Sequence, residues 1–447
     1  MLKKVLIYII LVLFIGINIV PIADSILLNV KHGTFENKIV NIQHNSNNKT
    51  LYVGGEESGN YSKIQDAIND SSDGDTVFVY NDSSPYYENI VIDKTINLIG
   101  ENKETTIIDG NKVNHIVCIS ADYVRIRGFT LKNGNNYNGI NIYSNYNSIS
   151  GNIIGSNNFD GTNLLNSNNN TITDNIISLN YRNGICLVES NSNTIKGNTI
   201  KYNRVDGIDM YSSDSNNILT NIIFKNGDGM DLLSSTNNFI SSNIFAYNDY
   251  GIILVYSTYN IISADTITEN IEDGILLWHS YRNTIIGNDI RYNYENGIYL
   301  LNSSNNTIIS NNITSNDKEG VYLHQNSSNN NIYHNNFITI YINAYDECNN
   351  NWDDGKYGNY WSDYKEKYPD AKKKLGKGIW DIPYEITEGD NKDMYPLIKQ
   401  WPNTLSKNLP KNKLLTIPIV YKFLEKLILY FPIFKQVLNY HSIYKLN

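Results

Sequence analysis

Residues 206–228 read DGIDMYSSDSNNILTNIIFKNGD, and this stretch decides the fold because it recurs along the chain. Each copy opens on a glycine with Asn, Asp or Glu before it and Ile or Val after it. Successive copies begin 22 or 23 residues apart, clearly at Gly139, Gly184, Gly207, Gly274, Gly297 and Gly320, and more loosely at Gly161, Gly229 and Gly251. A fixed period of roughly 20 to 50 residues indicates a solenoid.

Asparagine keeps the same period at two positions of the repeat. The first series is Asn157, Asn180, Asn203, Asn226, Asn248, Asn270, Asn293 and Asn316, and the second is Asn152, Asn175, Asn198, Asn221, Asn243, Asp265, Asn288 and Asn311. Asparagine accounts for 74 of the 447 residues, about one in six. We expect each of these side chains to bond the turn backbone and the asparagine of the next coil, so most of the asparagine is structural.

Each repeat contains three short β-rich pieces, which in one copy are residues 207–210, 217–219 and 221–224. None shows the helical period of 3.6. The repeat therefore predicts an all-β fold, a single-stranded right-handed parallel β-helix with three strands per coil of 22–23 residues. Apolar residues one and three positions after each glycine should stack inside, with the glycine–asparagine corners outside. The leucine consensus of a leucine-rich solenoid is absent.

Both ends of such a stack need caps, because terminal coils expose unpaired strand edges. Residues 50–110 are expected to form the N-terminal cap and first coils, with a short helix over 63–70 that begins at a capping box from Ser62 to Gln65. Residues 111–345 are the β-helix repeats. Residues 346–403, rich in Trp, Tyr, Gly and Pro, are expected to form an irregular C-terminal cap.

The outermost segments differ from the repeats. Residues 1–25 have the pattern of a signal peptide, since about 15 apolar residues fall short of the roughly 20 that span a bilayer, and an uncleaved anchor is the alternative. Residues 404–447 carry seven lysines and one glutamate, so this basic tail is +6 and the remainder of the chain −15. We expect an extracytoplasmic protein that is secreted or on the cell surface. Its tail is an amphipathic helix lying on a membrane or envelope surface, or one that folds onto the solenoid or a partner.

Charge and cysteine content exclude some classes of protein. The net charge is −9 and the body has no long basic stretch, which argues against a nucleic-acid partner. Three distant cysteines, Cys118, Cys186 and Cys348, without a CxxC motif exclude a cysteine zinc site and a disulfide framework.

Several segments resemble a known group of proteins. The opening Tyr52-Val53-Gly54-Gly55 and Gly74-Asp75-Thr76-Val77, with the closing segments 358–364 and 394–397, resemble archaeal surface β-helix proteins. Those proteins share the β-helix domain of the NosD copper-accessory family and the repeat of carbohydrate-binding and sugar-hydrolase (CASH) proteins. The resemblance covers about residues 50 to 400 and implies a pectin lyase-like fold, which hosts lyases, hydrolases, epimerases and adhesins.

The sharpest group of candidate catalytic residues is acidic. Asp206 and Asp228 precede their glycines and Asp209 and Asp231 follow two positions later, each pair 22 residues apart. Adjacent strands lie about 5 Å apart, so four carboxylates are expected to meet in one patch. Such a patch can work as a general acid/base pair on a glycoside or bind calcium, with Asp209 and Asp231 as calcium candidates. The alternative is that these are repeat-borne turn aspartates exposed to solvent.

Aromatic residues and histidines gather beyond the acids. Candidate ligand-binding residues are Tyr211, Tyr256, Trp278, Tyr299, Tyr322 and His324. Flat rings along a solenoid can stack on sugar faces, and His279 with Arg282 is a candidate pair for lyase or epimerase chemistry. The alternative is that long side chains merely cover a sheet face.

The sequence thus favours a surface protein that binds or displays itself on polysaccharide or glycoprotein without catalysis. The alternatives are a polysaccharide-active enzyme and a structural envelope or adhesion component. No cofactor is expected. Copper is disfavoured because the seven histidines are scattered and Met210 and Met230 fall at inward positions. At 369–378, where similar caps often carry a calcium loop, three consecutive lysines stand in place of oxygen ligands.

Overall fold

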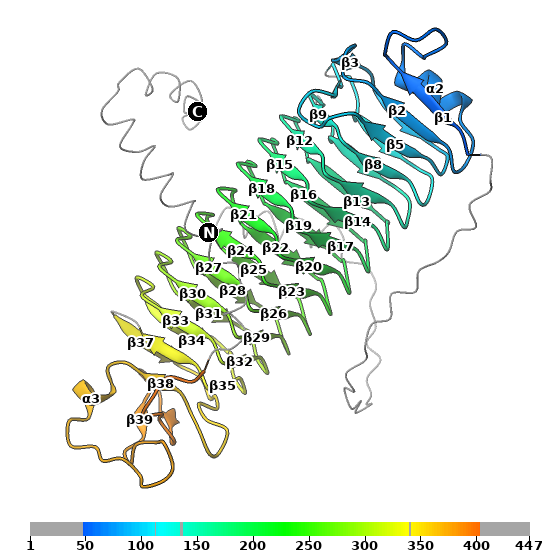
Figure 1. The fold of residues 1–447 in the computed structure, drawn as a ribbon. Helices are drawn as coiled ribbons and strands as arrows, with labels where there is room; N and C mark the ends of the chain where they lie inside the picture. The colour runs from blue at the N-terminus through cyan, green and yellow to red at the C-terminus, as the bar shows by residue number, and fades with distance from the viewer. Residues whose placement is uncertain (1–47, 112, 135–136, 339–340, 403–447) are drawn as a thin grey trace, which may run out of the picture. The chain divides into compact units, whose positions relative to one another are not determined.

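The computed structural model describes residues 48–402 except 112, 135–136 and 339–340. The predicted signal peptide and basic tail lie outside the described residues. Short parallel strands succeed one another along one axis, and each coil adds one strand to each of three sheets (Figure 1). The predicted right-handed parallel β-helix is confirmed.

The three sheets comprise 13, 12 and 13 strands within the described residues, and each strand is only two to six residues long. Sheet A contains β1 (Thr50–Val53), β2 (Thr76–Val79), β5 (Asn97–Gly100), β8 (Arg125–Arg127), β11 (Ser148–Ser150), β14 (Thr171–Thr173), β17 (Thr194–Lys196), β20 (Asn217–Leu219), β23 (Phe239–Ser241), β26 (Ile261–Ser263), β29 (Thr284–Ile286), β32 (Thr307–Ile309) and β35 (Asn331–Tyr333). Sheet B contains β3 (Tyr86–Tyr87), β6 (Ile107–Asp109), β9 (Thr130–Lys132), β12 (Ile153–Gly155), β15 (Ile176–Ser178), β18 (Thr199–Lys201), β21 (Ile222–Phe224), β24 (Ile244–Ala246), β27 (Thr266–Thr268), β30 (Asp289–Arg291), β33 (Asn312–Thr314), β36 (Asn336–Ile338) and β38 (Tyr360–Trp361). Sheet C contains β4 (Ile90–Ile92), β7 (Val117–Ile119), β10 (Ile140–Ile142), β13 (Thr162–Leu165), β16 (Ile185–Val188), β19 (Ile208–Tyr211), β22 (Met230–Leu233), β25 (Ile252–Val255), β28 (Ile275–Trp278), β31 (Ile298–Leu301), β34 (Glu319–His324) and β37 (Ile342–Asp346).

The repeat glycines line up along the axis at the entrance to sheet C. A Cβ built on Gly184 would lie 2.6 Å from the Gly207 carbonyl oxygen, and one built on Gly207 would lie 2.6 Å from that of Gly229. Glycine is required here because the next coil's backbone occupies the space of a side chain. The alignment also fixes the register, which pairs Ile208 with Met230 and Asp209 with Asp231.

The core is a set of apolar columns inside the coil. The residues one and three positions after each glycine are fully buried, as the sequence predicts; Ile208, Met210 and Met230 all have 0% exposure. Neighbouring residues of each strand point outward, because side chains alternate across a strand. Function therefore depends on the outward columns of the three sheets.

The asparagines lie inside the corners, so the expectation that these corners face outward is wrong. The side chain of Asn221 has 0% exposure, and its Oδ1 accepts hydrogen bonds from the backbone N–H (2.9 Å) and Nδ2 (3.0 Å) of Asn198. Asn198 Nδ2 also donates to the Ile172 carbonyl at 2.8 Å. A corner must turn backbone polar groups toward the core, and the amide satisfies them there.

A further asparagine ladder has the same period and was not predicted. It occupies the corner between sheets C and A and consists of Asn147, Asn170, Asn193, Asn216, Asn238, Asn260, Asn283, Asn306, Asn330 and Asn350. The two predicted series form the ladders between sheets A and B and between B and C. Each corner of the coil thus holds a column of side-chain amides, with Asp265 as a carboxyl member of the column between sheets A and B.

Helix α2 (Ile64–Asp70) covers the N-terminal end of the stack, with Ile64, Ala67 and Ile68 buried. The predicted capping box is wrong, because no side chain of the helix's own first turn caps it. Instead Glu88, from the segment before β4, accepts hydrogen bonds from the backbone N–H groups of Ile64 (2.8 Å) and Gln65 (2.9 Å). A carboxylate there also complements the positive end of the helix dipole.

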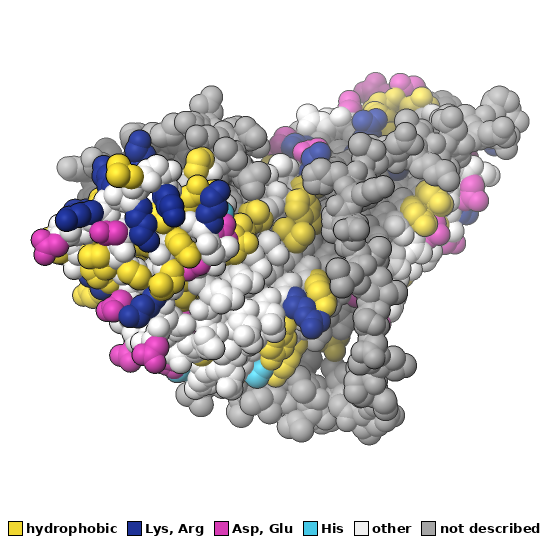
Figure 2. All heavy atoms as spheres, turned by 90° about the horizontal axis from the view of Figure 1, so that it is seen from below, with side chains coloured by type: hydrophobic (Ala, Val, Ile, Leu, Met, Phe, Trp, Pro, Cys, Tyr) yellow, Lys and Arg dark blue, Asp and Glu magenta, His cyan; other side chains and the backbone are white. Residues whose placement is uncertain are grey.

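The C-terminal cap consists of α3 (Tyr364–Lys367) and the antiparallel pair β39 (Tyr384–Glu385) and β40 (Lys392–Asp393), with irregular chain between them. Two of its tryptophans are buried and bonded to carboxylates: Trp352 Nε1 donates to Asp346 at 2.9 Å and Trp361 Nε1 to Asp393 at 2.8 Å. Figure 2 shows Lys and Arg side chains gathered on this end, whereas the adjoining coils present mainly uncharged polar side chains and backbone. Among the residues that the structure describes, no helix is long and apolar enough to cross a bilayer.

Candidate functional site

Two outward columns of sheet C carry most of the predicted site residues. The first runs through Cys186, Asp209, Asp231, Ile253, Leu276, Tyr299, Tyr322 and Tyr345. The second runs through Val188, Tyr211, Leu233, Val255, Trp278, Leu301 and His324. Adjacent members of a column are one strand spacing apart, about 4.8 Å.

Asp209 and Asp231 are neighbours in the first column. Asp209 is half-buried and Asp231 is buried. Asn183 Nδ2 donates to Asp209 Oδ2 at 2.9 Å. Burial, together with the charges of Asp160 and Asp228, raises the pKa of Asp209 to about 6, while Arg182 and the hydrogen bond from Asn183 oppose the shift. A carboxyl group that titrates near neutral pH can exchange protons with a bound molecule.

Asp206 and Asp228 have a structural role in the corner before sheet C. The backbone N–H of Asp228 donates to Asp206 Oδ1 at 3.3 Å, and that of Tyr250 donates to Asp228 Oδ1 at 3.3 Å. Both aspartates are buried, so the alternative of solvent-exposed turn aspartates is wrong for them. They continue an outer corner ladder in which Asp160 and Asn183 bond in the same way.

The predicted aromatic residues form two adjoining groups. In the first, the Tyr256 and His279 rings stack with centroids 5.1 Å apart, and Trp278 lies 5.8 Å from His279. In the second, Tyr299 and Tyr322 stack at 5.0 Å, and His324 lies 5.3 Å from Tyr322. Strands β28 and β31 are neighbours, so the two groups lie on adjacent coils, with Leu301 beside Trp278 and Leu276 beside Tyr299 in the register. We call Tyr256, Trp278, His279, Tyr299, Tyr322 and His324 the aromatic face.

Tyr211 is not part of this face. Leu233 and Val255 stand between Tyr211 and Trp278 in the second column, a separation of three strand spacings, or about 14 Å. His279 is likewise apart from the acids: it follows β28, two strands beyond the Asp231 strand β22, or about 10 Å. The predicted partner of His279, Arg282, instead donates to the Tyr259 hydroxyl.

Further charged groups near the acids were missed by sequence reasoning. Asp160 and Arg182 flank Asp209 from the corners of earlier coils, and burial raises the pKa of Asp160. A second acidic group, Glu272, Asp273 and Glu295, occupies the same corner beside the aromatic face, and burial raises the pKa of Asp273 to about 7. The repeat could have revealed these residues, because each of them lies one or two positions before a repeat glycine.

The donor set does not fit a copper centre. Met210 and Met230 lie in the core with 0% exposure, where an ion has no access. In the described part of the chain, no three or more His, Cys, Asp or Glu residues are arranged to hold a metal ion.

Comparison with known proteins agrees with this architecture. A family model described as periplasmic copper-binding protein (NosD) matches residues 217–366, and one described as right handed beta helix region matches residues 114–262. Each match spans about a third of the chain. No curated protein sequence matches. The chain is a right-handed parallel β-helix protein.

Two solved structures illustrate the likeness in fold. The A-module of the mannuronan C-5 epimerase AlgE6 of Azotobacter vinelandii is 16% identical, with a TM-score of 0.56, covering 64% of this chain and 90% of that one. The structure of XylC in complex with xylose is 10% identical, with a TM-score of 0.50, covering 68% of this chain and 86% of that one. At these identities the likeness concerns the fold alone.

Proposed function

We propose that this chain is an extracytoplasmic protein that binds polysaccharide on the aromatic face of sheet C. The observation that carries the proposal is the placement of six rings on four successive coils, half-exposed or exposed and pointing away from the core. Planar rings offer apolar surface with a polar rim, which matches the alternating faces of a sugar chain. The periodic spacing of the coils suits a polymer better than a small ligand.

The charge beside the aromatic face selects among polymers. Asp231, Glu272 and Asp273 lie close by, while Lys318 is paired with Glu295. An acid-rich border repels uronates and sulfated chains. We therefore infer a neutral glycan as the ligand of this face.

Glycan-array screening of the full chain, followed by calorimetry on the best neutral oligosaccharide, tests the proposal. Trp278→Ala and Tyr322→Ala should each weaken binding at least about tenfold, since stacked aromatic residues dominate binding energies. The matched control is Tyr146→Ala, which removes an exposed ring that stacks on Tyr123 with centroids 4.9 Å apart, in the turn between β10 and β11, several coils before the aromatic face. Equal affinity of all three variants would contradict binding on the aromatic face.

Catalysis is a second candidate function, favoured by one observation. Asp209, with a pKa near 6, lies next to the buried Asp231 on the face that carries the rings. Glycoside hydrolysis uses two carboxyl groups about 5 to 9.5 Å apart, and two side chains on adjacent strands lie about 5 Å apart. Reducing-sugar assays on the full chain should then show turnover that Asp209→Asn abolishes. Binding without turnover across plant, algal and cell-wall polymers would remove this candidate.

Attachment to the cell envelope is assigned to the basic tail, residues 404–447. Its charge of +6 suits the anionic surface of a membrane. Deletion of 404–447 should release the protein into the medium, measured by blotting cell and medium fractions. A truncated protein that stays with the cells would show that the attachment lies elsewhere.

A further inference from the structure

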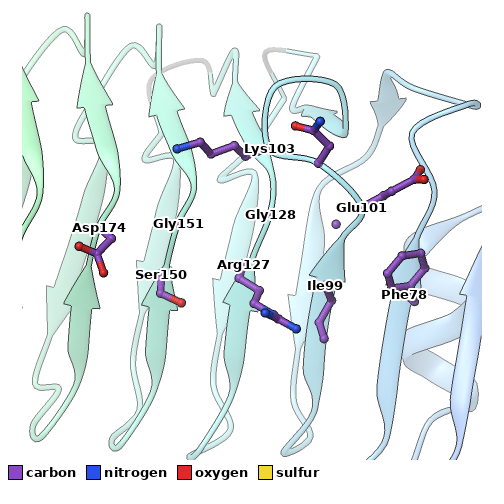
Figure 3. Close-up of a pocket in the computed structure, with 11 residues that line it drawn as sticks. Phe78, Ile99, Glu101, Lys103, Arg127, Gly128, Ser150, Gly151 and Asp174 are labelled. Carbon is purple, nitrogen blue, oxygen red and sulfur yellow. The ribbon is translucent and has the colours of Figure 1, made fainter.

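A concave site lies outside sheet C, at the corner between sheets A and B near the N-terminal end. It encloses about 510 Å³, within the range of roughly 300–1,000 Å³ usual for ligand pockets. Phe78, Arg127 and Ser150 form part of its lining, and a loop over 101–106 forms one wall (Figure 3). We call it the corner groove.

Glycines keep the corner groove open. Gly100, Gly128 and Gly151 occupy the corner position that carries a side chain in the next coil, Asp174. A Cβ on Gly128 would lie 2.2 Å from the Gly100 carbonyl oxygen, so these two coils approach closely. Gly151 has a φ of +64° and nothing within 4 Å of a built Cβ. A side chain at 151 would therefore project into the groove.

The loop that walls the groove is held on both sides. The Thr130 hydroxyl donates to the Lys103 carbonyl at 2.6 Å, and Glu101 accepts from the Asn81 backbone N–H at 2.9 Å. Asn81 Nδ2 also donates to the Thr105 hydroxyl at 2.9 Å. The groove is thus preformed, which lowers the entropic cost of binding a ligand.

Two cations in the groove are available to a ligand. Among the described residues, neither the Arg127 guanidinium nor the Lys103 ammonium has a hydrogen-bond or ion-pair partner. In the view of Figure 3, Arg127 extends toward Ile99 and Lys103 toward the coil of Gly151. Glu101 and Asp174 also line the groove, so its formal charge is balanced. A balanced groove favours a ligand with isolated negative groups over a dense polyanion such as a nucleic acid.

An aromatic cluster adjoins one end. Phe78 lies in register between Tyr52 and Ile99 on the outer face of sheet A. Its ring centroid is 5.2 Å from that of Tyr80 and 6.1 Å from that of Tyr52. Ile99 is in turn the register partner of Arg127, so rings and guanidinium share one outward row about 14 Å long.

We propose that the corner groove binds an acidic saccharide, a short run of uronic acid units. Arg127 and Lys103 would meet the carboxylates, because charge-assisted bonds to Arg favour planar carboxylates. Ser150, Asn102 and the two acids offer partners for hydroxyls, and the rings offer an apolar wall for a sugar face. This site is separate from the aromatic face, for which a neutral glycan is proposed.

Isothermal titration calorimetry of the full chain with trigalacturonate, neutral galactotriose and inorganic phosphate tests the proposal. We expect trigalacturonate to bind and galactotriose and phosphate to bind at least about tenfold more weakly at this site. Arg127→Gln should weaken trigalacturonate binding about ten- to a hundredfold. Arg125→Gln is the matched control: Arg125 is exposed on the same strand but does not line the groove, so the loss should stay below about threefold.

A second variant tests shape without altering charge. Gly151→Asn keeps a residue that tolerates positive φ and fills the groove, so trigalacturonate binding should fall about tenfold or more. Circular dichroism and the unfolding midpoint verify that each variant is folded. No binding by the unsubstituted chain, equal loss in Arg125→Gln and Arg127→Gln, or an unchanged affinity in Gly151→Asn would each overturn the proposal.

The two proposed sites are separated by a cross-test. Trp278→Ala should leave trigalacturonate binding unchanged. Loss of trigalacturonate binding in Trp278→Ala with retention in Arg127→Gln would overturn the corner groove and keep the aromatic face. The reverse pattern, with no neutral glycan bound anywhere, would support the corner groove while the proposed function of the aromatic face fails.

Discussion

The coils and the C-terminal cap bury polar groups in opposite ways. In the coils, an asparagine both accepts from the coil before it and donates to its neighbours, and translation by one repeat supplies the same partners again. In the cap no repeat exists, and buried aspartates collect the donors: Asp393 accepts from the backbone N–H of Asn359 and from Trp361 Nε1. A periodic structure can use neutral amides, whereas an irregular one concentrates donors on a carboxylate.

The largest effect is expected where one carboxylate serves several donors. Asp393→Ala leaves three donors without an acceptor, those of Asn359, Trp361 and Tyr395. The free energy of unfolding should fall by about 3–5 kcal/mol. Urea denaturation followed by tryptophan fluorescence measures the loss. Asp390→Ala, an exposed aspartate nearby, is the control, and equal stability of the two variants would contradict the role given to Asp393.

Removing one asparagine from a ladder should lower the free energy of unfolding somewhat less than Asp393→Ala does. Asn221→Ala removes the acceptor of two Asn198 donors and the bond from Asn221 Nδ2 to the Ile195 carbonyl. We expect a loss of about 2–4 kcal/mol in the free energy of unfolding, measured by urea denaturation. Asn217→Ala in the same coil, at a half-buried outward position, should change stability by less than about 0.5 kcal/mol. A neutral Asn221→Ala would refute the ladder's contribution.

One rung already departs from the pattern and can be repaired. Asp265 Oδ1 accepts from the Asn243 backbone N–H and Nδ2, but the buried Oδ2 has no partner within the described residues. Burial raises the pKa of Asp265 to about 8. Because the ordinary value is about 3.9, folding takes up a proton between about pH 4 and pH 8, and stability falls as pH rises through that window.

Asp265→Asn should therefore raise the free energy of unfolding at pH 7 by about 1–3 kcal/mol and remove that contribution to the pH dependence. Chemical denaturation at pH 5, 7 and 8.5 measures both effects. Asn288→Asp, one coil further along the ladder, should introduce the same decline with pH. A pH profile of Asp265→Asn that parallels the original protein would show that Asp265 is not the titrating group.

The smallest effect concerns the other end of the stack. Glu88→Ala removes the carboxylate that accepts from the first two N–H groups of α2, and the unfolding free energy should fall by about 0.5–2 kcal/mol. Glu104→Ala, an exposed residue in the loop over 101–106, is the control for loss of a negative charge. Thermal unfolding followed by circular dichroism distinguishes the two. Identical midpoints would exclude Glu88 as the cap.

Features that recur in every coil could be predicted from the sequence. The inward columns at Ile208 and Met210 and the neighbourhood of Asp209 and Asp231 follow directly from the period, because identical positions in adjacent coils are adjacent in space. The burial of the asparagine side chains was missed, because side chains alternate regularly between inside and outside in a strand but not in a corner. The capping role of Glu88 was missed because its partners are more than 20 residues away in the chain.

The corner groove was invisible in the sequence for a different reason. It arises from missing side chains at Gly128 and Gly151 and from a loop insertion at 101–106, and neither is a motif. The outward direction of the aromatic residues was expected, because side chains alternate along a strand. That alternation does not reveal that Leu233 and Val255 separate Tyr211 from the other rings. Whether a ring belongs to the aromatic face depends on the coil that carries it.

The way the ladders terminate makes the number of coils adjustable. The ladder between sheets C and A ends at Asn350, whose backbone N–H donates to Asn391 at 3.2 Å, and the one between A and B ends at Asn359 on Asp393 at 2.7 Å. Every interior coil meets coils with the same corner asparagines or Asp265, and these end partners stay the same however many coils intervene. Duplication of a single 22–23-residue unit would thus lengthen the molecule by about 4.8 Å without new contacts. Gene duplication can therefore set the length of the solenoid in steps of one coil.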